Sequence, residues 1–149
     1  MESGFPTRLY APDEADQLVP HLERVFAAIG EHQGIMRGIV ERLAAFGVDL
    51  GKAMPAAAQA SAEVTTLIDQ ALTQHRFIVE QMQSLAELGV EVKALDGLCD
   101  VRSEHDGRIV YLCWRRGEPA FGHWHEIEAG FAGRQPIVER SDFQGTLLN

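Results

Sequence analysis

Two histidines separated by one residue form the first candidate site in the sequence. His123 and His125 flank Trp124. If this segment is a strand, both imidazoles point to the same face and can bind one metal ion, as paired strand histidines do in zinc and iron sites. Asp100 or Glu91 could complete the ligand set from a neighbouring strand. The alternative is structural, with one histidine buried against a backbone carbonyl and the other exposed.

A second candidate site consists of polar residues that are expected near strand ends. Asp100, Glu118, His125 and Arg134 form this set, with Arg115 close by. A histidine between carboxylates, with an arginine nearby, can perform general acid–base chemistry or bind a carboxylate or phosphate ligand. As structural ion pairs, the same residues would each contribute under about 1 kcal/mol when exposed. The sequence leaves open whether the chain is an enzyme.

The remaining histidine pair lies in the helical half of the chain. His32 and His75 fall in two apolar seams and face each other in one register of the expected helix pair. Facing histidines can bind haem or a metal, but the Glu-x-x-His pattern of di-iron bundles is absent, since Ile29 and Leu72 stand three residues before them. The structural alternative is that they fix the helix register, and a shift of one heptad would separate them.

The two cysteines give no sign of nucleophilic or disulfide chemistry. Cys113 lies beside Trp114 in an apolar strand-like run, which is typical of an inert core thiol. Neither Cys99 nor Cys113 belongs to a Cys-x-x-Cys unit. A Gly-x-Ser-x-Gly elbow, a P-loop and a Gly-x-Gly-x-x-Gly motif are also absent from the sequence, so hydrolase-elbow and nucleotide-binding functions receive no support.

The strands that would carry these residues begin after Gly89, where the apolar period changes to two. Alternation and turn dipeptides predict strands at 90–95, 98–101, 109–114 and 121–127. A glycine-rich loop follows at 130–136, and residues 139–149 are expected to form a tail. The strand at 109–114 is apolar on both faces, which predicts that it lies between the helices and a second layer.

Residues 12–88 predict a long antiparallel helical hairpin. Apolar residues recur in steps of four and three from Leu18 to Phe46, and again in a second helix that starts near Ala56. The loop between them, at 47–55, is short, so the helices fold back on each other, and one register pairs Leu22 with Leu85 and Leu43 with Val64. Pro20 either kinks the first helix or marks its start after a short separate turn.

Apolar residues beside the two seams need further cover. Phe26, Ile35 and Leu72 are examples. A second copy of the hairpin would cover such residues by completing a four-helix bundle. We therefore expect a homodimer.

Composition limits the classes of partner. The 149 residues contain 13 basic and 22 acidic side chains, for a formal charge of −9. This charge repels phosphate backbones and anionic membranes, so neither nucleic acid nor a membrane is an expected partner. The first residues lack a basic stretch followed by an apolar run, and no apolar stretch reaches the roughly 18–20 residues of a membrane span. The expected location is the cytoplasm.

Several glycine-flanked motifs of the strand half resemble one known family. They include Gly97-Leu98-Cys99-Asp100, the run from Gly107 to Trp114, Trp124-His125 and Gly130-Phe131-Ala132-Gly133-Arg134. Together with Asp13-Glu14-Ala15 near the start, they resemble the prokaryotic family known as domain of unknown function 2203. The resemblance covers nearly the whole chain and implies no established activity. The chain departs from the family pattern at Val101-Arg102 and at His123.

The sequence thus predicts an α+β fold in one domain, residues 1–149. Its parts are a helical hairpin at 12–88, a small antiparallel β-meander with a glycine-rich loop at 90–138, and a tail at 139–149. The leading functional hypothesis is a non-enzymatic dimeric assembly or interaction protein. The alternative is a small-ligand or metal-binding protein that uses Asp100, Glu118, His125 and Arg134, with a divalent metal at His123 and His125.

Overall fold

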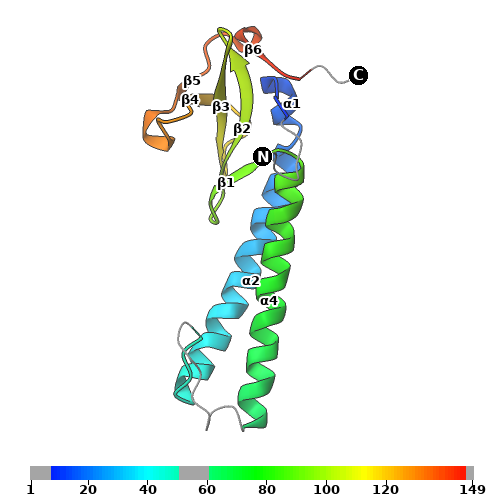
Figure 1. Cartoon of the computed structure of the whole chain (residues 1–149), viewed down its shortest axis with the longest axis vertical. Helices are drawn as coiled ribbons and strands as arrows, with labels where there is room; N and C mark the ends of the chain where they lie inside the picture. Colours follow the sequence, from blue (N-terminus) through cyan, green and yellow to red (C-terminus); the bar gives the residue numbers. More distant parts are fainter. Residues whose placement is uncertain (1–7, 51–60, 147–149) are drawn as a thin grey trace, which may run out of the picture. The chain divides into compact units, whose positions relative to one another are not determined.

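The structure is a computed structural model that describes residues 8–50 and 61–146. It has an α+β fold, with helices and an antiparallel sheet (Figure 1). Two compact units make up the chain: Ala28–Gln81, and Met1–Ala27 together with Met82–Asn149. The end of the predicted interhelical loop and the predicted helix start near Ala56 lie outside the described residues. The single-domain assignment therefore stays a prediction.

Of the two expectations for Pro20, the structure agrees with the second, in which the long helix starts near Pro20 after a short separate turn. Helix α1 is a short separate helix, Pro12–Asp16, and α2 spans Val19–Ala45. Pro20 lies in the first turn of α2, where its missing N–H costs no hydrogen bond. Before α1, the backbone N–H of Ala11 donates a 2.8 Å hydrogen bond to the Glu14 carboxylate.

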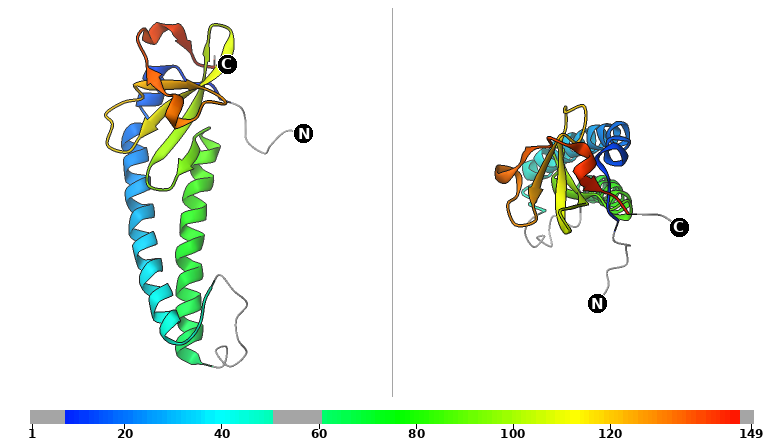
Figure 2. Two further views of the ribbon diagram at one scale, coloured as in Figure 1. Left: turned by 90° about the vertical axis from the view of Figure 1, so that its left-hand side faces the viewer. Right: turned by 90° about the horizontal axis from the view of Figure 1, so that it is seen from above.

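The unit formed by residues 28–81 is a pair of helices with its own small core. Here α2 packs against α4, which spans Ala62–Glu87, and the two run antiparallel (Figures 1 and 2). Leu43 and Val64 belong to one buried cluster, as the expected register requires. The predicted seam residue Ile68 packs against this cluster and is partly buried, and Leu67 beside it is buried as well.

The other unit contains one antiparallel sheet. Its strands are β1 (Glu91–Ala94), β2 (Leu98–His105), β3 (Arg108–Arg115), β4 (His123–Glu126), β5 (Gln135–Pro136) and β6 (Phe143–Gln144). They follow the order β1-β2-β3-β4-β5, and β6 pairs with the far end of β2. Gly97, with φ of 118°, makes the predicted β1–β2 turn, a conformation that residues with a side chain rarely adopt.

Two parts of the sheet differ from the sequence prediction. The strand expected at 98–101 continues to His105 as β2, and a turn at Asp106 and Gly107 connects it to β3. The segment expected to be a tail contains a 3-10 turn, Arg140–Asp142, and β6, whose Phe143 is buried. Phe143 stacks on His105, with ring centroids 4.3 Å apart. This contact and the pairing with β2 hold residues 139–146 against the sheet.

The two faces of the sheet have different chemistry. Val101, Leu112 and Trp114 lie on the apolar face and are fully buried, and Trp114 contacts Phe26 of α2 at a ring-centroid distance of 6.1 Å. The intervening residues, such as Asp100 and Cys113, point to the opposite, polar face. The expectation that β3 is covered on both sides is consistent with this burial. Among the described helices, none is both long and apolar enough to cross a membrane.

Candidate functional site

The polar face of the central strands carries the residues that could do chemistry. Asp100 on β2 is the cross-strand partner of Cys113 on β3, and Tyr111 is the partner of His125 on β4. Directly paired residues of an antiparallel sheet point to the same face, with Cβ atoms roughly 4.5–5.5 Å apart. The register therefore brings a carboxylate, a thiol and an imidazole together from three adjacent strands.

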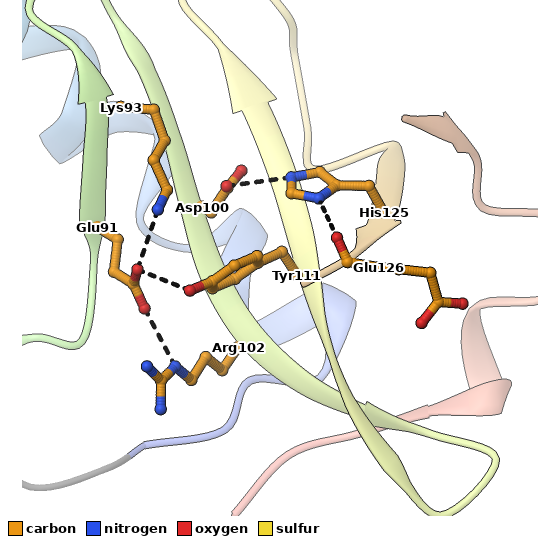
Figure 3. A network of polar contacts seen from close by, with 7 residues as sticks. All are labelled: Glu91, Lys93, Asp100, Arg102, Tyr111, His125 and Glu126. Carbon is orange, nitrogen blue, oxygen red and sulfur yellow. Dashed lines mark hydrogen bonds and ion pairs between the residues drawn. The ribbon is translucent and has the colours of Figure 1, made fainter. Parts of the chain in front are cut away.

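Asp100 and His125 form a buried pair at the centre of this face. Their side chains are 3% and 1% exposed, and His125 Nε2 lies 3.1 Å from Asp100 Oδ2 (Figure 3). On the other side of the ring, Nδ1 is 2.8 Å from the backbone carbonyl oxygen of Glu126. Because a carbonyl only accepts hydrogen bonds, Nδ1 carries the proton there. The hydrogen bond from Nδ1 to this carbonyl therefore holds the ring so that Nε2 faces Asp100.

The Asp100–His125 contact requires one shared proton. With Nδ1 protonated, Nε2 and Oδ2 attract each other only if the carboxyl group or Nε2 itself carries a second proton. Burial raises the pKa of Asp100, and the opposing effect of His125 does not fully compensate. The second oxygen, Asp100 Oδ1, is buried and has no hydrogen-bond partner within the described parts of the chain. A buried acceptor without a donor is available to a ligand.

Cys113 completes a set of three side chains that could hold a metal ion. One ligand atom each from Asp100, Cys113 and His125 lie within 4.8 Å of one another, and all three residues are buried. Burial, together with the negative charge of Asp100, raises the pKa of the Cys113 thiol to about 12. Such a thiol is not a nucleophile at neutral pH unless a metal or another cation stabilises the thiolate.

A small cavity lies next to this set. Its volume is about 170 Å³, and it is lined by the three ligand residues and by Lys93, Leu98, Tyr111, Ile127, Gly130 and Phe131. Drug-sized ligands occupy pockets of about 300 Å³ or more, so the cavity suits an ion or a molecule of a few heavy atoms. The 3-10 turn Phe131–Gly133 and the residues before it supply one of its walls.

A charged network on β1 and β2 borders the cavity. Glu91 accepts hydrogen bonds from Tyr111 Oη at 2.8 Å, Lys93 Nζ at 3.2 Å and Arg102 Nε at 3.1 Å (Figure 3). Burial acts to raise the pKa of Glu91, but these three partners outweigh it and the pKa is lowered. Glu91 is therefore ionised at neutral pH, and Lys93 and Arg102 together carry one positive charge more than it does.

Lys93 owes its place to a β-bulge. The register shifts between Val92 and Ala94, so Lys93 is an extra residue on β1. Bulges of this kind redirect a side chain and are frequent beside functional sites. Here the bulge places Lys93 at the cavity wall.

Glu118 and Arg134 form a second pair beside the first. Arg134 donates a 2.9 Å hydrogen bond to Glu118 Oε1, and its guanidinium lies 4.8 Å from the ring centroid of Phe131. Burial acts to raise the pKa of Glu118, but the hydrogen bonds from Arg134 and the backbone N–H of Arg115 lower it. This ion pair is next to Cys113 and does not line the cavity. The four predicted site residues thus form two separate pairs.

His123, the other histidine of the predicted metal site, is not part of the Asp100–Cys113–His125 set. Both lie on β4, as predicted, and His123 is the cross-strand partner of Cys113. Its Nδ1 lies 3.9 Å from Glu118 Oε2. The groups near His125 that could bind the same ion are Asp100, which the sequence suggested, and Cys113, which it did not.

The helical histidines are apart. His75 is exposed, whereas the ring of His32 stacks on Phe77 at 3.8 Å and its Nδ1 contacts the amide of Gln74. His32 therefore faces the turn of α4 that the predicted register requires, but its partners there are Gln74 and Phe77, which flank His75.

Sequence reasoning missed Cys113 and Lys93 as site residues. Cys113 was interpreted as core because its neighbours Leu112 and Trp114 are apolar, yet in a strand these neighbours point to the opposite face. Pairing Asp100 with Cys113 through the β2–β3 turn would have identified the cluster. For Lys93, no feature of the sequence predicts the β-bulge.

The chain was compared with known proteins. A protein family described as an uncharacterised conserved protein, domain of unknown function 2203, matches residues 8–137. No curated protein and no solved structure matches the chain. The matched region includes every residue of the Asp100–Cys113–His125 cluster and the cavity beside it. The chain therefore belongs to the DUF2203 family.

Proposed function

We propose that this protein binds a divalent transition-metal ion, best matched by zinc, through Asp100, Cys113 and His125. The observation that carries the proposal is the convergence of three buried ligand atoms of three kinds within 4.8 Å. Zinc is bound by thiolate, imidazole and carboxylate groups, whereas magnesium and calcium prefer oxygen ligands alone.

The spacing of the ligand atoms supports this choice. Zinc–ligand bonds of about 2.0–2.3 Å in a tetrahedron put neighbouring ligand atoms ~3.5 Å apart. His125 Nε2 and Asp100 Oδ2 are 3.1 Å apart, and the whole set lies within 4.8 Å. Movements of about 1 Å, within the range of side-chain rotations, would therefore suffice for coordination.

The surroundings of the ligands also fit a metal centre. Metal-ligating histidines usually donate their second N–H to a carbonyl or carboxylate, as His125 Nδ1 does to the Glu126 carbonyl. The ligands come from three paired strands, which hold them more rigidly than loops would. Asp100 contacts both the imidazole of His125 and the thiol of Cys113, and its Oδ1 has no hydrogen-bond partner among the described residues, which leaves it available to an ion.

Cobalt substitution tests the proposal with a matched control. A cobalt ion bound by a thiolate gives a sulfur-to-metal charge-transfer band, and elemental analysis counts the bound zinc. We expect one equivalent of either ion in the wild type, and loss of the band and of binding in Cys113→Ala and Asp100→Asn. Cys99→Ala is the control, because Cys99 is an equally buried thiol whose neighbour in sequence, Asp100, points to the other face.

The outcome that contradicts the proposal is specific. If the wild type takes up no zinc or cobalt after refolding with either ion, the site is not a metal centre. If Cys113→Ala binds as tightly as Cys99→Ala, Cys113 is not a ligand.

As a second candidate function, we propose self-association through the 28–81 unit, which would make the protein a dimeric assembly or interaction protein. The supporting observation is a set of exposed apolar side chains on both helices. Ile35 and Leu72 are 49% and 53% exposed, and Val40 and Val79 are also exposed. Packing against a second hairpin would bury them in a four-helix bundle. The two candidate functions use different parts of the chain and do not exclude each other.

A further inference from the structure

Three ligands from the protein leave one position of a tetrahedral ion open. Catalytic and ligand-binding zinc centres have this composition, whereas structural centres use four protein ligands. The cavity beside Asp100, Cys113 and His125 is where a fourth ligand would be accommodated. Its contents can be inferred from its charge, volume and wall chemistry.

The charges around the cavity favour one negative charge. Two positive charges on a zinc ion balance the carboxylate of Asp100 and the thiolate of Cys113, while His125 is neutral as a ligand. Glu91 is matched by Lys93, and Arg102 adds a further positive charge on the same network. With zinc bound, the metal centre is neutral and the network of Glu91, Lys93 and Arg102 carries one positive charge. A monoanion would neutralise this charge.

The volume and the walls limit the size and shape of that anion. A cavity of about 170 Å³ has room for about five waters at roughly 30 Å³ each. Leu98, Ile127 and Phe131 provide apolar walls, and the ammonium group of Lys93 lies on the side of β1. The ring of Phe131 is flanked by the guanidinium groups of Arg115 and Arg134, at 5.6 and 4.8 Å from its centroid, which hold it in place.

We propose that the fourth position of the metal binds a small monocarboxylate, with its carboxylate between the ion and Lys93 and its short apolar part against Leu98, Ile127 and Phe131. This inference rests on the metal site of the proposed function. The two cations would bind the charged end of such a ligand, and the apolar walls would contact its apolar end. A phosphate would add a second negative charge and leave the apolar walls without a partner.

Titration of the cobalt-loaded protein tests the inference. Propionate is the probe, propionamide is its neutral counterpart of the same shape, and the visible d–d bands of cobalt report a change of ligand. We expect saturable spectral changes with propionate and none with propionamide. In Lys93→Met the propionate affinity should fall about tenfold, and Lys93→Arg should retain it, because the lost contact is a charge-assisted hydrogen bond.

Arg108→Met is the matched control for charge. Arg108 lies on β3, pairs with Glu126 at 2.5 Å and does not line the cavity. Its loss removes one positive charge from the same sheet, so propionate affinity should be unchanged. An equal loss in Arg108→Met and Lys93→Met would mean that general charge attraction explains the binding, and the inference would fail.

The remaining outcomes separate this inference from the metal site itself. If the cobalt charge-transfer band depends on Cys113 but propionate leaves the d–d bands unchanged, the metal site stands and the carboxylate inference is wrong. The inference is also wrong if propionamide or inorganic phosphate binds better than propionate. If the protein takes up no cobalt, both proposals fail.

Discussion

At the scale of single residues, the position of one proton on His125 determines what the site can do. The bond from Nδ1 to the Glu126 carbonyl turns Nε2 toward Asp100. Without a metal, a proton occupies the space between Nε2 and Oδ2, and the thiol of Cys113 keeps its own proton because its pKa is raised to about 12. A metal ion must displace both protons in order to bind.

This proton count predicts a steep pH dependence of metal affinity. Binding should release about two protons, one from Cys113 and one from the Asp100–His125 pair, so the logarithm of the zinc affinity should rise by about two per pH unit around neutrality. The sign follows from mass action, because low proton concentration favours the deprotonated ligands. Titration calorimetry in buffers of different ionisation enthalpy measures the number of protons directly. A value near one, from Cys113 alone, would show that the pair does not share a proton.

At the scale of elements, the short strand β6 anchors the C-terminal segment. Phe143 is 4% exposed and contacts His105 and Trp124, whose ring centroids lie 4.3 and 5.6 Å from its own. A segment held in this way is part of the folded sheet and contributes to its stability.

Truncation of Phe143 should therefore destabilise the protein. We expect Phe143→Ala to lower the free energy of unfolding by about 3 kcal/mol, the range found for buried aromatic residues. Val138→Ala, immediately before this segment, is the control. Val138 is 94% exposed, so its loss should change stability by under about 0.5 kcal/mol. Urea denaturation measures both variants, and equal stabilities would mean that residues 139–146 are a tail after all.

The sequence predicted the long elements better than the short ones. Regular apolar spacing identified both long helices and the strands around Cys113, because a buried face repeats over many residues. Strands of two residues, such as β5 and β6, carry no such repeat. They form only because β4 and β2 offer them free edges.

The sequence identified individual site residues but not which of them lie together across the strands. Asp100 and His125 are candidates by residue type, and the structure brings their side chains into contact. Their common partner Cys113 depends on the register of β2 with β3, which a turn of unknown length left unspecified. In the helices, the predicted register identifies the turn of α4 that faces His32 but not the side chain that contacts it, since Gln74 does so and His75 is exposed.

At the scale of the whole molecule, net charge and exposed apolar surface act in opposite directions on self-association. A charge of −9 makes two copies repel each other, whereas exposed side chains such as Leu72 favour burial in an interface. Salt weakens the repulsion over distances beyond about 8 Å at physiological ionic strength and leaves apolar contacts intact.

We therefore expect a dimer that becomes more stable as salt is raised. Light scattering coupled to size exclusion should give the mass of two chains at physiological salt, with more monomer at low salt. Leu72→Glu should shift the wild-type equilibrium toward the monomer, whereas Val138→Glu, an equivalent change outside the helices, should not. A monomer at every salt concentration would remove self-association as a candidate function.

The shared proton also has a consequence for how the site is filled and emptied. In zinc fingers the empty site leaves ligands without partners, and the domain unfolds when the ion departs. Here Asp100 and His125 satisfy each other when the ion is absent, and the three strands that carry the ligands pair through their backbones regardless. We therefore expect the protein to remain folded whether or not an ion occupies the proposed site, so that occupancy would follow the supply of metal in its surroundings.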